Sequence, residues 1–513
     1  MTVRTPRERR SRRRLAARLP GPHERRDAKV KPARIDPSNT TFVLLSFEGP
    51  DAYSFVGGLG IRSINLSRTL ARSGFTNHFF FVGDPKLKGE DAICGGKVVL
   101  HRWCQWISRY CPDGVYQGEH EKHRDFSQSI PQFVVEHVVK SAADSGRMVV
   151  VLAEEWHTAN AVCALSERLE KEGLRDRVVM LWNANNTYGF DLIDWGRLES
   201  SAVITTVSRY MKHIMWGMGL NALVIPNGIP ASLLRGVDDE VVDEQRRAFG
   251  AGLILFKMAR WHPDKRWKVA VEAVAQLKED GLRPLLIARG GREPYGFEVA
   301  EHARSMGLTV RDADTDSPSL EDRFAALQAA TPADVINVKF HVPPEMSRLL
   351  YRAADGVLAN SGHEPFGLVG LEAMAAGGVA YTGCTGEDYA IPFVNCFMLE
   401  TDDPAEISGY AASLRDSPEE EVKIRKLARR TARQFTWEAA IQNLLGKLDN
   451  QARAQGMLNG TNGSRPGHAR DESDSILREH HLLALAREVE QRQLEYCTRG
   501  NNGACLSVRV ASQ

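Results

Sequence analysis

Two glutamates, Glu364 and Glu372, lie eight positions apart in the segment SGHEPFGLVGLEAMAAG. The apolar residues 356–359 before it are typical of a strand, and the residues after Gly367 favour a helix. The first backbone N–H groups of a helix have no partner within the helix and favour an anion, and glycines let a ligand approach a loop closely. Because carboxylates accept hydrogen bonds from sugar hydroxyls, the pattern predicts a site for a polyhydroxy compound beside a phosphate, with a capped surface helix as the alternative.

The elements that must position these glutamates alternate along two halves of the chain. Apolar runs separated by helix-length segments predict parallel sheets with helices on both faces. In the first half the predicted strands are 41–46, 79–82, 98–103, 148–153, 178–182, 203–208 and 222–228. After a charged stretch at 238–247, the predicted strands are 253–259, 284–288, 335–338, 356–359 and 379–381.

We therefore predict an α/β fold with two tandem Rossmann-like domains, over 41–235 and 236–450. Such sheets bind ligands at the carboxyl ends of their strands, so we expect the site in a cleft between the domains. Residues 1–40 are predicted to be a disordered basic leader, and residues 451–513 a linker followed by a tail helix over 476–496.

The formal net charge of the 513 residues is +1, but the charge is unevenly distributed. Residues 1–40 hold 13 basic and 4 acidic residues, whereas residues 41–450 hold 45 basic and 54 acidic residues. The leader alone favours a polyanion, so we do not expect nucleic acid to be the main partner.

The composition also bears on location. No apolar run approaches the ~20 residues of a membrane span, and no apolar segment follows the Arg-rich start, as an export signal requires. The eight cysteines are irregularly spaced, which favours reduced thiols. We expect a cytoplasmic protein.

The segment with the two glutamates resembles the E-x7-E region of retaining GT-B glycosyltransferases of family 4 (glycosyl transferases group 1), which include bacterial glycogen and starch synthases. The resemblance extends over about 41–448. In that group the first glutamate contacts the donor sugar, the following backbone holds the sugar and the diphosphate, and the second glutamate binds the ribose. The resemblance assigns these roles to Glu364, to Phe366, Gly367 and Leu368, and to Glu372.

Three further segments match the same family. Arg260 and Lys265, in KMARWHPDK, resemble the pair of cations that binds the donor diphosphate. Fixed cations there stabilise the negative charge that the leaving group gains, without a metal. Taken alone, an exposed Arg and Lys are usually only solvated.

Gly57 and Gly58, in VGGLG, resemble the Gly-Gly-Leu loop, whose backbone N–H groups reach the phosphates or the acceptor. Glycogen synthases have a lysine where this chain has Val56, which argues against a true glycogen synthase. A glycine-rich turn is also common in every Rossmann-like fold.

His157, in EEWHTA, resembles the histidine of the D-W-H segment that contacts the donor sugar. A lone histidine at a strand end is more often structural. The segment NANNTYG at 183–189 occupies the position of the family's acceptor-side loop.

Two patterns point to metals instead. The D-x-D in 312–316 resembles the metal motif of GT-A enzymes, but acidic turn residues before a Ser-Pro pair are usually solvated. A zinc site is conceivable from a second set, but its spacing fits no standard pattern and its segment reads as an irregular loop. That set is His101, Cys104, Cys111, His120 and His123. We predict no metal site and no cofactor apart from the nucleotide-sugar co-substrate.

The resemblance implies a retaining, metal-independent hexosyltransferase that moves a sugar from a nucleotide diphosphate sugar to a hydroxyl acceptor such as a glucan or a small glycoside. Two alternatives stay open at this point. One is a nucleotide-sugar 2-epimerase of the same fold, and the other is a non-catalytic protein that binds sugars or polyanions.

Overall fold

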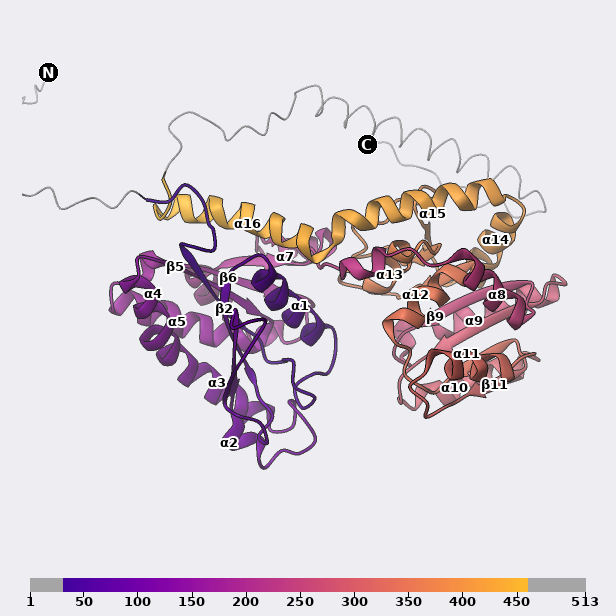
Figure 1. Ribbon diagram of the computed structural model, residues 1–513, viewed down its shortest axis with the longest axis horizontal. Coiled ribbons are helices and arrows are strands. Elements are labelled where there is room, and N and C mark those ends of the chain that lie inside the picture. Colours follow the sequence, from indigo (N-terminus) through magenta and orange to yellow (C-terminus); the bar gives the residue numbers. More distant parts are fainter. Residues whose placement is uncertain (1–30, 460–513) are drawn as a thin grey trace, which may run out of the picture.

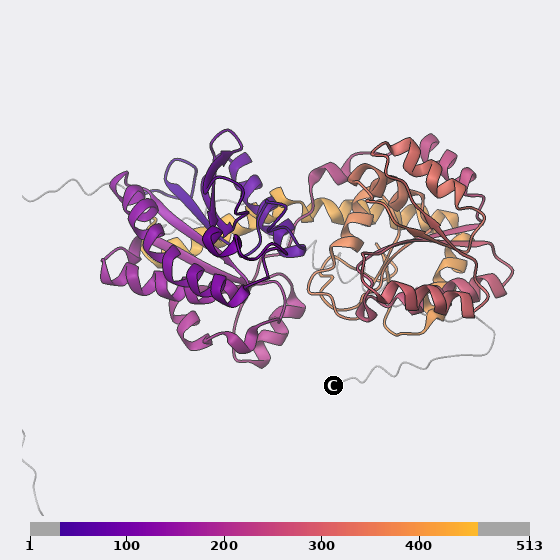
Figure 2. The same cartoon turned by 90° about the horizontal axis from the view of Figure 1, so that it is seen from below.

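The computed structural model describes residues 31–459, which form two α/β domains side by side (Figures 1 and 2). The first has an eight-stranded sheet in the order β3-β4-β2-β1-β5-β6-β7-β8, and the second a seven-stranded sheet in the order β11-β12-β10-β9-β13-β14-β15. All pairings are parallel except that of β3 with β4. The predicted α/β class with two Rossmann-like domains is confirmed.

The strands of the N-terminal domain are β1 (Thr40–Leu45), β2 (Thr76–Val82), β3 (Glu90–Ile93), β4 (Val98–Trp103), β5 (Met148–Glu154), β6 (Val178–Ala184), β7 (Val203–Thr206) and β8 (Leu223–Val224). Its helices are α1 (Gly58–Arg72), α2 (Gln105–Ser108), α3 (Glu119–Phe133), α4 (Lys140–Asp144), α5 (Ala159–Lys171), α6 (Trp195–Ser201) and α7 (Arg209–Gly217). Successive residues of β1 belong to different cores: Val43 packs with the cluster that contains α5, and Leu44 with the cluster that contains α1. Helices therefore cover both faces of this sheet, which explains its nearly continuous apolar strands.

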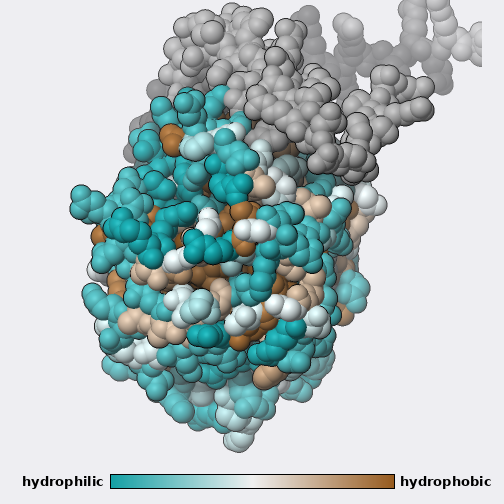
Figure 3. All heavy atoms as spheres, turned by 90° about the vertical axis from the view of Figure 1, so that its right-hand side faces the viewer, coloured by the Kyte–Doolittle hydropathy of each residue, from teal (hydrophilic) through white to brown (hydrophobic). Residues whose placement is uncertain are grey.

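The strands of the C-terminal domain are β9 (Leu253–Met258), β10 (Pro284–Arg289), β11 (Val310–Ala313), β12 (Val335–Val338), β13 (Gly356–Ala359), β14 (Ala380–Thr382) and β15 (Phe397–Met398). The helices after β8 are α8 (Asp239–Phe249), α9 (Trp267–Glu279), α10 (Tyr295–Ser305), α11 (Leu320–Ala329), α12 (Pro344–Ala353), α13 (Leu368–Ala376), α14 (Pro404–Arg415), α15 (Pro418–Ala432) and α16 (Trp437–Ala454). The outward face of this domain is mainly hydrophilic (Figure 3).

Every predicted strand is present, although β8 is much shorter than the predicted 222–228. The edge strands β3, β11 and β15 were not predicted, because each is short and none carries a continuous apolar run. No helix among residues 31–459 has the length and apolarity needed to cross a bilayer.

The last helix, α16, packs on the N-terminal domain, although it follows the C-terminal domain in the chain (Figure 1). Its residues Trp437, Ile441, Leu444 and Leu448 join Leu66 and Leu152 of that domain in one core. The predicted range 236–450 includes most of this helix, although the helix packs on the first domain.

The two crossings between the domains touch each other. The N–H of Ile229 donates to the carbonyl of Phe435 at 2.9 Å, and the N–H of Trp437 donates to the carbonyl of Ile229 at 3.1 Å. A Cβ on Gly228 would lie 2.6 Å from the Trp437 backbone, so only glycine fits this crossing. Residues 228–229 and 435–437 therefore form one compact hinge.

Part of the predicted leader is structured. Residues 31–39 run along the end of α16, where the N–H of Ile35 donates to Asp449 at 2.7 Å and the N–H of Asn459 donates to the carbonyl of Pro32 at 2.9 Å. The rest of the leader and the predicted tail helix lie outside the described residues.

Candidate functional site

On the C-terminal domain, two loops meet at the carboxyl ends of the neighbouring strands β9 and β13. The N–H of Gly362 donates to the carbonyl of Asp264 at 2.8 Å, and the N–H of His363 donates to the Asp264 carboxylate at 3.2 Å. These bonds hold the loop that contains Lys265 against the loop that contains Glu364. We call this region the donor-side half-site.

Lys265 and Glu364 form its centre. Their Nζ and Oε2 atoms are 2.7 Å apart, and the side chains are 17% and 26% exposed, so a ligand can reach both. Arg260 is exposed on the same loop, and its side chain makes no hydrogen bond or ion pair within residues 31–459. The pair and Arg260 can therefore present two cations and one carboxylate to a ligand.

A buried lysine that the sequence reading missed lies beneath this pair. Lys257 donates to the side-chain carbonyl of Asn360 and to the carbonyl of Leu358, and its ammonium lies 5.1 Å from the ring centre of Trp267. Burial, with the nearby charge of Lys265, lowers the pKa of Lys257 to about 7. The available signal was a single lysine inside the apolar strand LILFKM.

Glu372 lies in α13, one turn after Gly367, which adopts a left-handed conformation at the helix start. Its carboxylate accepts a hydrogen bond from the Tyr351 hydroxyl at 3.1 Å, and burial raises its pKa to about 7. The Phe366 side chain is buried against Tyr389, so its backbone alone is left for a ligand. The donor-binding roles of Phe366, Gly367, Leu368 and Glu372 stay predictions.

Residues 383–388, which the sequence analysis did not single out, hold the backbone of Glu364 by hydrogen bonds. The N–H of Glu364 donates to the Thr385 hydroxyl at 2.9 Å, and the carbonyl of Glu364 accepts from the N–H of Gly386 at 2.9 Å. Glu387 is only 5% exposed, and its Oε1 has no partner among the described residues. Burial, with the charge of Glu364, raises the pKa of Glu387 to about 7.

On the N-terminal domain, His157 follows β5 in a short turn, Trp156–Thr158. The imidazole is 4% exposed and stacks between Phe47, at 4.2 Å, and Trp156, at 3.9 Å between ring centres. Its Nε2 lies 2.7 Å from the carboxylate of Glu119, whereas Nδ1 has no partner among the described residues. Burial lowers the pKa of His157 despite Glu119, so the ring is neutral, with its proton on Nε2 and a lone pair free on Nδ1.

The glycine-rich loop binds a carboxylate of the protein itself, and the donor-binding roles of Gly57 and Gly58 stay predictions. One oxygen of the buried Glu48 accepts from the N–H groups of Val56 at 3.2 Å, Gly57 at 3.0 Å and Gly60 at 3.0 Å, and the other accepts from the Tyr116 hydroxyl at 2.6 Å. The N–H of Gly57 is therefore already used within the protein, and binding of a phosphate there would require displacement of Glu48. The sequence pattern around Gly57 and Gly58 gives no sign of this, because Glu48 comes from the preceding loop.

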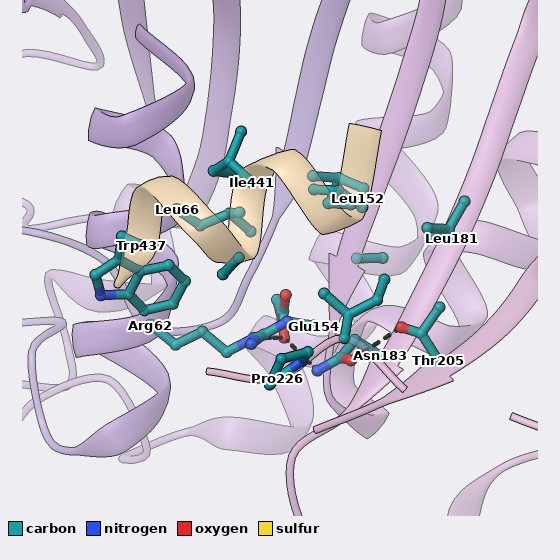
Figure 4. Close-up of a pocket in the computed structure, with 14 residues that line it drawn as sticks. Arg62, Leu66, Leu152, Glu154, Leu181, Asn183, Thr205, Pro226, Trp437 and Ile441 are labelled. Atoms are coloured by element: carbon teal, nitrogen blue, oxygen red, sulfur yellow. Dashed lines mark hydrogen bonds and ion pairs between the residues drawn. The ribbon is translucent and has the colours of Figure 1, made fainter. Parts of the chain in front are cut away.

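A buried ion pair connects the loops around His157 and Glu48 to the hinge (Figure 4). Arg62 donates to Glu154 at 2.9 Å and to the side chain of Asn227, next to Gly228, at 2.5 Å. The same carboxylate oxygen accepts from the amides of Asn183 and Asn185 at 2.9 and 2.8 Å. We call the loops around His157 and Glu48 the acceptor-side half-site.

Glu155 follows Glu154 in the chain and precedes His157 by two residues. It has a left-handed φ of 68° and is buried. Its carboxylate accepts from the N–H of Asn185 at 2.7 Å, and burial raises its pKa to about 8. A buried acidic residue in this unfavourable conformation is held by its surroundings and marks a specialised position.

The metal patterns do not gather ligands in the part of the chain that the structure describes. No group of three or more His, Cys, Asp or Glu side chains there could hold a metal ion. Asp312 lies in the edge strand β11, where it accepts from Asn337 at 2.8 Å. The segment read as an irregular loop is partly helical, because α2 lies within it and α3 begins at Glu119.

The two domains also meet at an ion pair between Arg209 and Asp388. Arg209, which begins α7, bonds to Asp388 with its backbone N–H at 2.9 Å and its guanidinium at 3.3 Å. Asp388 belongs to the segment that supports Glu364. Within residues 31–459 no hydrogen bond or ion pair joins His157 directly to Lys265 or Glu364.

Comparison with known proteins shows what part of this chain is similar to. Residues 238–431 match the family model described as glycosyl transferases group 1. A D-inositol 3-phosphate glycosyltransferase of Corynebacterium efficiens is 25% identical over 230 residues, which are 43% of this chain and 49% of that protein. The chain spans about half the length of the curated relatives it matches.

Among solved structures, sucrose-phosphate synthase from Thermosynechococcus elongatus is similar with a TM-score of 0.57 at 19% identity, over 81% of this chain and 99% of that one. The Anabaena protein Alr3699/HepE in complex with UDP is similar with a TM-score of 0.53 at 15% identity, over 80% and 100%. At these identities the likeness shows the fold. Residues 238–431 are thus similar to glycosyl transferases group 1, within the two-domain GT-B fold.

Proposed function

We propose that the protein is a glycosyltransferase that moves a sugar, a hexose, from a nucleotide diphosphate sugar to a hydroxyl acceptor. The observation that carries this proposal is the ion pair of Lys265 and Glu364 at the carboxyl ends of β9 and β13, inside the segment that matches the glycosyltransferase family. The UDP bound by the HepE protein of the same fold supports a nucleotide donor.

The donor diphosphate binds Lys265 and Arg260. Binding attracts the Lys265 ammonium toward the phosphates, and Glu364 then accepts hydrogen bonds from the donor sugar. The two cations stabilise the charge that grows on the departing phosphate, a task they can perform without a metal ion.

When the domains close, the free Nδ1 of His157 accepts a hydrogen bond from a hydroxyl of the donor sugar. The acceptor oxygen forms a bond to the anomeric carbon as the bond to the diphosphate breaks, and the acceptor proton ends on the departing phosphate. Attack from the side of the leaving group retains the anomeric configuration. In this scheme no side chain forms a covalent intermediate.

The first experiment measures nucleotide release from UDP-, ADP- and GDP-hexoses, with and without a divalent chelator. Wild-type protein should release nucleotide from one donor class, with the chelator making no difference. Lys265→Ala and Glu364→Gln should both lower the rate of release by about a thousandfold. Lys268→Ala is the matched control, because this lysine follows the same loop and contacts only surface partners, Glu298 at 4.0 Å and the Tyr295 ring at 5.7 Å. Equal activity of wild type and Lys265→Ala would contradict the site.

The second experiment identifies the product. NMR of the reaction separates transfer, which joins the sugar to the acceptor with retained configuration, from epimerisation, which changes the free nucleotide sugar. An inverted product would contradict the retaining mechanism while leaving the donor site intact.

The six described cysteines are all unpaired, which supports a cytoplasmic location as a proposal that cell fractionation can test.

A further inference from the structure

Two carboxylates flank His157 on the acceptor-side half-site. Glu119 contacts its Nε2 at 2.7 Å, and Glu48 accepts a hydrogen bond from Tyr116, whose ring lies 5.9 Å from the imidazole. They come from different elements, the start of α3 and the loop after β1. The fold thus gathers acidic groups around one imidazole.

No cation balances this charge. Neither carboxylate forms an ion pair with a lysine or arginine in the described part of the chain, and the partners of Glu48 are neutral N–H and hydroxyl groups. Two buried cations of this domain already have partners elsewhere. Arg62 is bound to Glu154, and Lys122 donates to Tyr53 and to the carbonyls of Gly114 and Val115.

The same place has groups that can bind a ligand. The Nδ1 atom of His157, which is left for the donor sugar, is buried without a partner among the described residues, and next to the imidazole the Glu119 side chain is 31% exposed. Tyr188 is 69% exposed and meets Trp156 edge-on at 6.4 Å, so its ring is available for stacking on the C–H face of a polyol. Hydrogen-bond acceptors, a hydroxyl and an open aromatic face suit a compound rich in hydroxyl groups.

The donor side offers the opposite charge, because Arg260 and Lys265 lie there. An acceptor phosphate would meet the carboxylates with no cation to compensate, and charges of like sign repel strongly in a partly desolvated pocket. An amine would gain from the same carboxylates.

We infer that the acceptor is an uncharged or amine-bearing polyol and not a phosphorylated one. This inference rests on the proposed function, since it names the second substrate of that reaction. It separates the chain from the relatives named for D-inositol 3-phosphate, which it matches over less than half of its length.

The test uses the full chain and the donor that gives nucleotide release. Acceptors are offered in sets that differ only in charge: glucose, glucosamine and glucose 6-phosphate, and myo-inositol with inositol 3-phosphate. Transfer is measured by mass spectrometry of the product and by kcat/KM at low and high salt. We expect kcat/KM for the phosphorylated member to be at least about tenfold below that of its uncharged partner, with a gap that narrows as salt screens the charge.

A charge variant links this preference to the site. Glu119→Gln keeps an oxygen for the His157 N–H but removes one negative charge, and should narrow the gap about threefold. Glu121→Gln, two residues along the same helix and exposed, is the control and should leave the gap unchanged.

The outcomes are distinct. The inference is overturned if transfer to a phosphorylated acceptor is as fast as transfer to its uncharged partner. It is also overturned if the protein hydrolyses its donor but transfers to no unphosphorylated acceptor. Both results leave the donor chemistry standing. An unchanged gap in Glu119→Gln overturns the role of the carboxylates. Absence of nucleotide release with every donor and acceptor contradicts the proposed function itself.

Discussion

The two half-sites each contain a partly exposed carboxylate, but its partner differs in charge between them. On the C-terminal domain Glu364 is paired with the cation of Lys265, whereas on the N-terminal domain Glu119 is paired with a neutral imidazole. A cationic site can receive a diphosphate, and an acidic site cannot do so without displacing its own carboxylates. The difference assigns the anionic substrate to one domain and leaves the other for a substrate without negative charge.

The largest expected effect contrasts the two sides directly. Lys265→Ala removes charge stabilisation from the leaving group and should lower kcat about a thousandfold. Tyr188→Ala removes only a stacking surface and should raise the acceptor KM about tenfold with little change in kcat. Steady-state kinetics with both substrates varied would measure this, and a kcat loss of similar size in both variants would erase the contrast.

The next effect concerns stability. Arg62→Met leaves Glu154 buried without its cation and should lower the free energy of unfolding by about 3 kcal/mol. The double variant with Glu154→Gln should recover part of the loss, because no buried charge then lacks a partner. Chemical denaturation measures both, and if Arg62→Met also relaxed the preference between charged and uncharged acceptors, Arg62 would belong to the acceptor site.

A smaller effect depends on pH. The folded-state pKa of Glu387 is raised to about 7, so the folded protein binds a proton there that the unfolded chain has lost above its ordinary pKa near 4.5. Stability from this group is thus present at low pH and is lost as pH rises toward 7, by on the order of 2 kcal/mol.

Glu387→Gln should therefore raise the melting temperature at pH 8 and leave it nearly unchanged at pH 4.5. Glu419→Gln, exposed in the first turn of α15, is a control expected to act equally at both values. A stabilisation of Glu387→Gln that is the same at both pH values would show that its carboxyl is not protonated in the folded protein.

The smallest effect tests the contact between the halves. Arg209→Gln breaks the pair with Asp388, but the Arg209 side chain is mostly exposed, so unfolding should change by less than about 1 kcal/mol. If the pair aligns the two half-sites, kcat/KM should still fall severalfold while nucleotide affinity, measured by calorimetry, stays the same. Loss of nucleotide affinity would instead mean that Arg209 acts on the donor side alone.

Much of the fold was predictable, because buried parallel strands have recognisable apolar runs such as those of β5 and β9. The chain position of Lys265 and Glu364 after strands was also predictable, since loops at the carboxyl ends of neighbouring strands converge. Contacts made by isolated residues far apart in sequence were not. The bonds from Glu48 to the glycine loop, from Glu119 to His157, and from Thr385 to Glu364 depend on the tertiary arrangement and leave no periodic signal.

The position of α16 has a consequence for synthesis on the ribosome. The N-terminal domain emerges first, yet one face of its sheet, with Leu66 and Leu152, is covered by residues 437–454, which are made after the whole C-terminal domain. That apolar face must wait uncovered through the translation of about 200 further residues, at roughly 5 to 20 residues per second. The first domain to be made is therefore the last to be completed, and a chain that stops before Trp437 would leave an adhesive surface on an otherwise folded protein.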